Sequence, residues 1–301
     1  MQQFAGQLAF ITGGASGAGL GQAKVFGRAG CRIMIADIRQ DAVDQALAEL
    51  RSEGIDAKGI QLDITDRQAY AAAADEVERQ FGQAPTLLFN TAGVNNFGPI
   101  EKTTYGDFDW LIGVNLGGVV NGMVTFVPRM IASGQPCHIT TVASLGGFTG
   151  SALAGPYSAA KAAVINLMEG YRQGLEKYGI GVSVVCPANI KSNIARATLT
   201  RSAQYGETGY VEGEAAIASL DSIYQHGMEP EVLAAHVMQG IRDNALYIIP
   251  YPEVKEMIAG HFAQIVDAIP ALETDPEGAK KRTEALMEWA RGGAKVFTPG
   301  A

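Results

Sequence analysis

The 301-residue chain has few cysteines, only Cys31, Cys137 and Cys186. They form no Cys-x-x-Cys pair, and an odd number argues against a disulfide framework. Each falls in or beside a strand-like run, which predicts buried free thiols. Because free thiols persist in reducing compartments, we expect a cytoplasmic protein.

Basic runs and long apolar segments are also missing. The 23 Lys and Arg residues are outnumbered by 31 Asp and Glu, for a net charge of −8, so nucleic acid and anionic membranes are poor partners. No basic region precedes a long apolar stretch at the N-terminus, and no apolar run approaches ~18 residues, so neither a signal peptide nor a membrane span is expected. The four histidines lack metal-ligand spacing, so we expect no metal.

Short apolar runs alternate with longer amphipathic patterns along most of the chain. Such alternation predicts right-handed βαβ crossovers and an α/β fold with a doubly wound parallel sheet of seven strands, covered by helices on both faces. The expected strands are 8–13, 32–37, 58–64, 86–93, 138–144, 181–188 and 245–250.

Nothing in the composition divides the chain, because it has no repeat, low-complexity tract or Pro/Gly/Ser linker. We therefore predict one domain over 1–301. Two parts depart from the alternation: residues 189–228, a polar stretch read as an irregular insertion near the substrate, and 251–301, read as a helical C-terminal extension.

A glycine-rich turn, "TGGASGAGLG" at 12–21, joins the first strand to the first helix. Glycine lets backbone N–H groups approach a pyrophosphate at the positive end of a helix. A nucleoside-triphosphate loop would require lysine where Leu20 stands. Asp37 ends the second strand, where a carboxylate accepts hydrogen bonds from the adenosine ribose and repels a 2′-phosphate, which favours NAD over NADP. The alternatives are a plain structural turn and an aspartate that only caps the next helix.

Tyr157 and Lys161 lie four residues apart at the start of an apolar helix and so share a face. This spacing suits either a buried helix end or a proton-transfer site. With this pair and the glycine-rich turn, the chain resembles the short-chain dehydrogenase/reductase family over roughly residues 6–250. The resemblance rests on Thr12, Gly13, Gly17 and Gly19 as its TGxxxGxG motif, on Tyr157-Ser-Ala-Ala-Lys161 as its YxxxK, and on Ser144 and Asn115 at the family's spacing.

The resemblance implies a Rossmann-type fold and an NAD-dependent alcohol dehydrogenase. Its catalytic residues would be Ser144, Tyr157, Lys161 and Asn115. In two motifs the chain departs from the family, with "NTAG" at 90–93 for NNAG and "PANIKSN" at 187–193 for PGxxxT. The implied cofactor-binding residues are Thr12, Gly13, Ser16, Gly17, Gly19, Asp37, Asp63, Ile64, Asn90, Ala92, Gly93, Tyr157, Lys161, Pro187, Ile190 and Ser192.

For the substrate, Phe97, Phe148, Tyr205 and Tyr210 suggest a roomy, aromatic-lined pocket for a small aromatic molecule. Several stretches are similar to one branch of the family, the NAD-dependent Cα-dehydrogenases of bacterial lignin β-aryl ether breakdown. That branch oxidises the benzylic hydroxyl of arylglycerol-β-aryl ethers to a ketone. The alternatives are a dehydrogenase of steroids or other bulky alcohols, a 3-oxoacyl carrier-protein reductase, and, in a different class, a dinucleotide-sensing regulator.

The helices expected to carry Asn115 and Tyr157 are apolar on more than one face. One helix cannot bury all of that surface against its own sheet, so we expect a homodimer or homotetramer that pairs there. The alternative is that the C-terminal extension covers the surplus.

Overall fold

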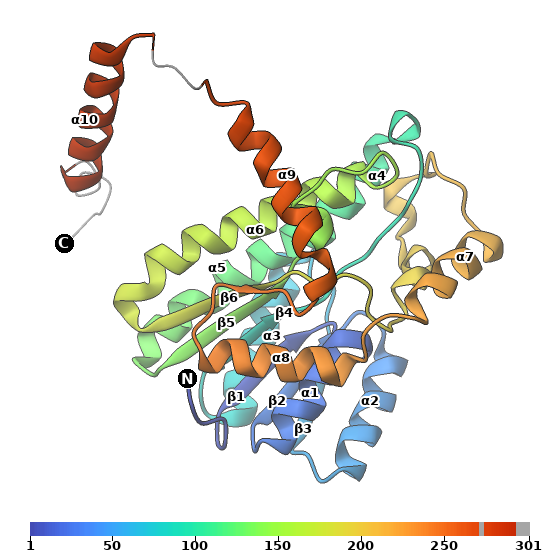
Figure 1. The fold of residues 1–301 in the computed structure, drawn as a ribbon. Coiled ribbons are helices and arrows are strands. Elements are labelled where there is room, and N and C mark those ends of the chain that lie inside the picture. Colours follow the sequence, from blue (N-terminus) through green and yellow to red (C-terminus); the bar gives the residue numbers. More distant parts are fainter. Residues whose placement is uncertain (271–273, 293–301) are drawn as a thin grey trace. The chain divides into compact units, whose positions relative to one another are not determined.

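A computed structural model describes residues 1–270 and 274–292 (Figure 1). The chain divides into two compact units, Met1–Pro252 and Glu253–Ala301, and each is described by itself.

The first unit is built on seven parallel strands, as predicted, and their order in the sheet is β3-β2-β1-β4-β5-β6-β7. Most strands end earlier than the apolar runs from which they were predicted. The fourth, for example, stops at Asn90, so residues 91–93 are free to form a loop beyond the sheet. The strands are β1 Leu8–Thr12, β2 Arg32–Asp37, β3 Ala57–Gln61, β4 Leu87–Asn90, β5 Cys137–Val142, β6 Ile180–Val185 and β7 Tyr247–Ile248.

Helices cover both faces of this sheet, as expected for strands that are apolar on two sides (Figure 1). On one face pack α1 (Gly17–Arg28), α2 (Gln40–Ser52) and α8 (Pro230–Arg242), which contribute Phe26, Val43 and Leu233 to the larger core cluster. On the other pack α3 (Arg67–Phe81), α5 (Gly118–Ser133) and α6 (Gly155–Leu175). There the ring of Phe10 in β1 lies 4.7 Å from that of Phe126 in α5.

Asn115 does not lie in a regular α-helix. It lies in a π-helical turn, Gly113–Gly117, that joins α4 (Tyr105–Ile112) to α5 without a break. Single π turns inside α-helices are rare and often mark functional sites, because they rotate a side chain out of the regular register. Here the turn sets the direction of the Asn115 side chain.

The continuous helix Tyr105–Ser133 is longer and more apolar than the sequence suggested. Among the described residues it is long and apolar enough to cross a membrane by length and composition, although no apolar run had seemed long enough. Half of its most apolar window is buried inside the protein. A core helix of a soluble protein passes the same test, so the finding is weak evidence for a membrane span.

The insertion over 189–228 is more ordered than predicted. It contains two 3₁₀ segments, Ile194–Thr200 and Ala203–Tyr205, and the helix α7 (Glu214–Tyr224). Its first half is tied to α4 through the fully buried carboxylate of Asp107, which pairs with Arg201 at 2.7 Å. The same carboxylate accepts hydrogen bonds from Thr208 Oγ1 at 2.6 Å and from the Gly209 N–H at 3.1 Å.

The second unit contains the two helices expected for the C-terminal extension, α9 (Lys255–Asp267) and α10 (Pro276–Gly292). A 3₁₀ turn, Pro252–Val254, precedes α9. Residues 271–273 and 293–301 of the predicted extension lie outside the described residues.

Candidate active site

A cavity of about 750 Å³ lies at the carboxyl ends of the strands. Loops that follow β1, β4, β5 and β6 all reach it, and it spans the point between β1 and β4 where the strand order reverses. Open α/β sheets bind ligands in this crevice, because neighbouring crossovers there run to opposite faces and leave a gap.

The glycine-rich turn forms one wall and leaves no room for side chains. A Cβ on Gly19 would lie 2.1 Å from the carbonyl oxygen of Gly13, and one on Gly17, whose φ is +48°, would lie 2.8 Å from Cβ of Ser192. Ser16 precedes α1 without capping it through its side chain, so the first backbone amides of α1 lack that partner. The turn therefore fits a pyrophosphate held by backbone N–H groups.

Thr12 supports this wall from behind rather than lining it. Its buried hydroxyl accepts hydrogen bonds from the N–H groups of Thr91 at 3.0 Å and Ala92 at 3.2 Å, which fixes the loop after β4 against β1. Thr91, where the family has asparagine, donates its hydroxyl to Gln22 of α1 at 2.6 Å. Asn90 is likewise buried, and its amide donates to Thr141 in β5 at 3.2 Å. These groups set the loop geometry.

Two carboxylates lie at the far end of the cavity, one at the last residue of β2 and one just after β3. Asp37 accepts a hydrogen bond from the Arg39 N–H at 3.2 Å. Burial raises the pKa of the Asp37 carboxyl group, and this effect outweighs the hydrogen bond and the charge of Arg39, which both lower it. Asp63 is oriented by Thr65, whose N–H and hydroxyl donate to it at 2.9 and 2.7 Å. Asp37 therefore does not cap α2 through its side chain but faces the cavity.

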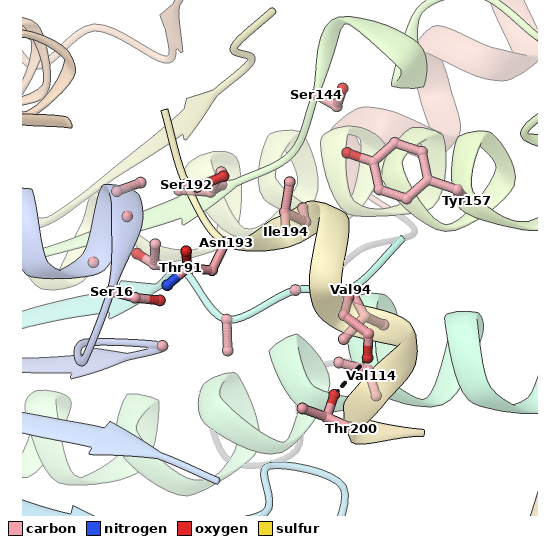
Figure 2. A pocket seen from close by; sticks show the side chains of 18 of the residues that line it. Ser16, Thr91, Val94, Val114, Ser144, Tyr157, Ser192, Asn193, Ile194 and Thr200 are labelled. Carbon is pink, nitrogen blue, oxygen red and sulfur yellow. Dashed lines mark hydrogen bonds between the residues drawn. The ribbon is translucent and has the colours of Figure 1, made fainter. Parts of the chain in front are cut away.

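Tyr157, in the first turn of α6, points its hydroxyl into the cavity, as Figure 2 shows. Burial raises the pKa of its phenol, and the nearby Ser144 hydroxyl opposes that rise. Ser144 lies just past β5, where its hydroxyl accepts the N–H of Gly146 at 3.1 Å. A ligand oxygen placed between these two hydroxyls would meet a proton donor or acceptor on each.

Lys161 lies one turn further along α6 and is buried. Burial lowers the pKa of its ammonium to about 8. Its Nζ donates to the carbonyl of Val142 at 2.9 Å and would lie only 3.4 Å from a Cβ on Gly93. Asn115 does not line the cavity, but its amide bonds both backbone groups of Val94, at 2.9 and 3.1 Å, and so holds the loop in front of Lys161.

The remaining predicted site residues also line the cavity. Ser192, with Asn193 and Ile194, forms the wall across from Tyr157 (Figure 2). The Ser192 hydroxyl donates to the Ile190 carbonyl at 3.3 Å. Together the lining brings in these predicted residues: Gly13, Ser16, Gly17, Gly19, Asp37, Asp63, Ile64, Ala92, Gly93, Ser144, Tyr157, Lys161, Pro187, Ile190 and Ser192.

Of the four aromatic residues predicted to border the site, two do so. Phe97 lies with its ring 6.1 Å from that of Tyr157, and Tyr205 is also in the lining. Tyr210 instead bonds Thr103 through its hydroxyl at 2.5 Å, and Phe148 packs on Tyr247, so neither is part of the cavity wall.

Trp110 and Tyr224 line the cavity without having been predicted. Trp110 lies on α4, whose amphipathic pattern gives no sign of a ligand. Tyr224 is the last residue of α7, and its hydroxyl accepts a hydrogen bond from Asn95, which lies in a loop far away in the sequence. No motif contains either residue, so the sequence offered no signal.

The family model for short chain dehydrogenases matches residues 7–202, and the chain belongs to this family. It is thus a dehydrogenase whose cofactor is a nicotinamide dinucleotide. A C alpha-dehydrogenase of Sphingobium sp. strain SYK-6 is 70% identical over 300 residues, covering 100% of this chain and 98% of the relative.

Solved structures agree with this assignment. The apo form of LigD from Sphingobium sp. strain SYK-6 superposes with a TM-score of 0.77 at 63% identity, covering 90% of this chain and all of that one. A short chain dehydrogenase/reductase from Burkholderia phymatum in complex with NAD superposes with a TM-score of 0.82 at 27% identity, covering 91% of this chain and 99% of that one.

Proposed function

We propose that this protein is an NAD-dependent Cα-dehydrogenase, which oxidises the benzylic hydroxyl of lignin-derived arylglycerol-β-aryl ethers to the ketone. The observation that carries the proposal is the 70% identity, from end to end, with a protein named C alpha-dehydrogenase. An intact Ser144, Tyr157 and Lys161 on the wall of one cavity support it.

The turn over 12–21 and the loop after β4 would hold the dinucleotide, because their glycines leave room for a backbone-bound pyrophosphate. When bound, the dinucleotide would supply the hydride acceptor for the alcohol carbon. Tyr157 takes the proton of the alcohol, and Ser144 holds the oxygen and stabilises its developing charge.

Lys161 serves Tyr157 in this scheme. A phenol is a poor base at neutral pH, and an ammonium group one helical turn away favours the phenolate form. Its Nζ lies 5.8 Å from the centre of the Tyr157 ring. Asn115 keeps the loop at Val94 in place, so it supports Lys161 from outside the cavity.

The choice of NAD over NADP rests on Asp37 and its surroundings. Its carboxylate faces the end of the cavity where the adenosine ribose would lie and would repel a 2′-phosphate. Arg39 also lines that end, but its guanidinium pairs with Asp41 at 3.8 Å, which reduces its availability to a phosphate.

We also propose that subunits pair through the helix Tyr105–Ser133 and α6. Half of the most apolar window of that helix is not buried, and Val124 on α5 is 64% exposed. A symmetric interface would cover this surface. Light scattering should therefore give at least a dimer at micromolar concentration, and a stable monomer would contradict the pairing.

The three buried free cysteines fit a reducing, cytoplasmic location.

The activity can be tested with NAD and a racemic arylglycerol-β-aryl ether dimer. We expect NADH, followed by its absorbance, and the α-ketone, with conversion stopping short of completion if one stereoisomer is preferred. A hydroxysteroid with NAD, and a 3-oxoacyl thioester with NADH or NADPH, serve as controls. An inert dimer, together with rapid turnover of either control, would refute the assignment of substrate and leave the family assignment standing.

A further inference from the structure

Tyr224 lines the same cavity as Tyr157 and Tyr205. It is the last residue of α7, a helix with no fully buried residue. The Tyr224 hydroxyl accepts a hydrogen bond from the Asn95 amide at 2.9 Å. Asn95 is itself buried, and it precedes Phe97, whose ring packs against Tyr157. Tyr224 is therefore held on the substrate side of the cavity, near the reacting group.

The hydrogen bond with Asn95 leaves one capacity of Tyr224 unused. A phenol has one proton to donate as well as lone pairs to accept. Asn95 Nδ2 can only donate, so the bond uses a lone pair of the oxygen and leaves the phenolic proton available. Within residues 1–270 and 274–292 the Tyr224 hydroxyl donates no hydrogen bond. The proton is available to a ligand in the cavity.

Tyr157 and Tyr224 differ in the protonation state that their surroundings favour. Burial, followed by the neighbouring charge of Tyr157, raises the pKa of Tyr224 to about 12. Tyr224 therefore stays protonated at neutral pH even while Tyr157 loses its proton to become the base. Two titratable groups of the same kind commonly take different roles in one cavity when their environments give them different pKa values.

We propose that Tyr224 determines substrate specificity by donating a hydrogen bond to an oxygen of the substrate other than the hydroxyl being oxidised. This rests on the proposed function, because an arylglycerol-β-aryl ether carries such oxygens on its ether linkage, side chain and ring. A simple benzylic alcohol carries none. Tyr224 thus recognises the oxygenated part of the dimer while Tyr157 and Ser144 hold the reacting oxygen.

The test compares Tyr224→Phe with the native enzyme on two substrates, the β-aryl ether dimer and 1-phenyl-1-propanol. A neutral hydrogen bond contributes about 0.5–1.5 kcal/mol, so kcat/KM for the dimer should fall roughly 2- to 12-fold. The loss should appear in KM, with kcat nearly unchanged, because the bond forms equally in the ground and transition states. For 1-phenyl-1-propanol neither constant should change.

Tyr210→Phe is the matched control, since it removes a hydroxyl from the same insertion but outside the cavity wall. It should leave the ratio of the two kcat/KM values unchanged. Asn95→Ala, which removes the group that orients Tyr224, should shift that ratio in the same direction as Tyr224→Phe.

The outcomes separate this assignment from the proposed function. An equal loss on both substrates would mean that Tyr224 only positions α7, and no loss on either would mean that it makes no substrate contact. Both results overturn the specificity role while the native activity stands. If the native enzyme oxidises only the simple alcohol, the proposed function and this role fail together.

Discussion

The buried carboxylate of Asp107 should be the main support of the substrate-side insertion, and Asp107→Asn tests it. Asparagine keeps the size of the side chain and removes its charge. Asp107 is fully buried on α4 and holds three separate points of the insertion, at Arg201, Thr208 and Gly209. Its loss should therefore release the wall formed by 194–210.

The magnitude follows from the burial of the partner. The Arg201 side chain is only 6% exposed, so the substitution leaves a guanidinium group buried without its counter-charge. Removing one partner of a buried pair typically costs about 3–5 kcal/mol of the free energy of unfolding. We expect a loss of that size, because the other groups that contact the Arg201 guanidinium, the carbonyls of Tyr205 and Gly206 and the ring of Trp110, supply no counter-charge.

Urea unfolding of the full chain measures this loss. Asp75→Ala is the control, since its pair with Arg129 is exposed, with 72% of the Asp75 side chain accessible. Such surface pairs contribute about 0–1 kcal/mol. Limited proteolysis should also cut the variant within 194–213 faster than the native chain. A variant as stable as the control, with unchanged cleavage, would refute the role of Asp107.

Acid should reveal the same interaction. Burial opposes ionisation of Asp107, but hydrogen bonds from Thr208, Thr104 and Gly209 outweigh it and lower the pKa to about 2. A carboxyl whose pKa is lower in the folded state stabilises the protein above its ordinary pKa near 4 and loses that contribution as pH falls toward 2. The stability gap between native protein and Asp107→Asn should therefore narrow between pH 4 and pH 2.

Three further predictions concern the site. Tyr157→Phe should keep dinucleotide binding, measured by fluorescence titration, and lower turnover by about 10²–10⁴-fold; near-normal turnover would exclude proton transfer by Tyr157. Asp37→Ala should weaken NAD binding and raise kcat/KM for NADP relative to NAD, and a native preference for NADP would contradict its role. Lys161→Met should abolish turnover yet stabilise the ligand-free protein at pH 7 by up to about 3 kcal/mol, because burial lowers the pKa of Lys161 from 10.5 to about 8. That advantage should shrink as pH rises from 8 to 10.5, which urea unfolding at both pH values would measure. A stability difference between variant and native protein that is the same at both pH values would contradict this prediction.

The sequence alone determined the sheet, the cofactor turn and the pair Tyr157 and Lys161. These features depend on neighbours close in the chain: two-sided apolar runs, glycines that permit a close approach, and a four-residue spacing that places two side chains on one helical face. Such patterns are set by local geometry, so they can be read before the tertiary structure is known.

Only the tertiary structure decided how the substrate side is built. Asn95 and Tyr224 are 129 residues apart, and Asp107 reaches partners 94 and 101 residues away. Neither set has a periodicity or motif, because each contact exists only after the crossovers have brought α4, the loop after β4 and the insertion together. The π turn that carries Asn115 belongs here as well, since its apolar sequence fits a regular helix equally well. Local patterns therefore predict the chemistry of this protein, whereas the packing of distant segments sets the wall that its substrate meets.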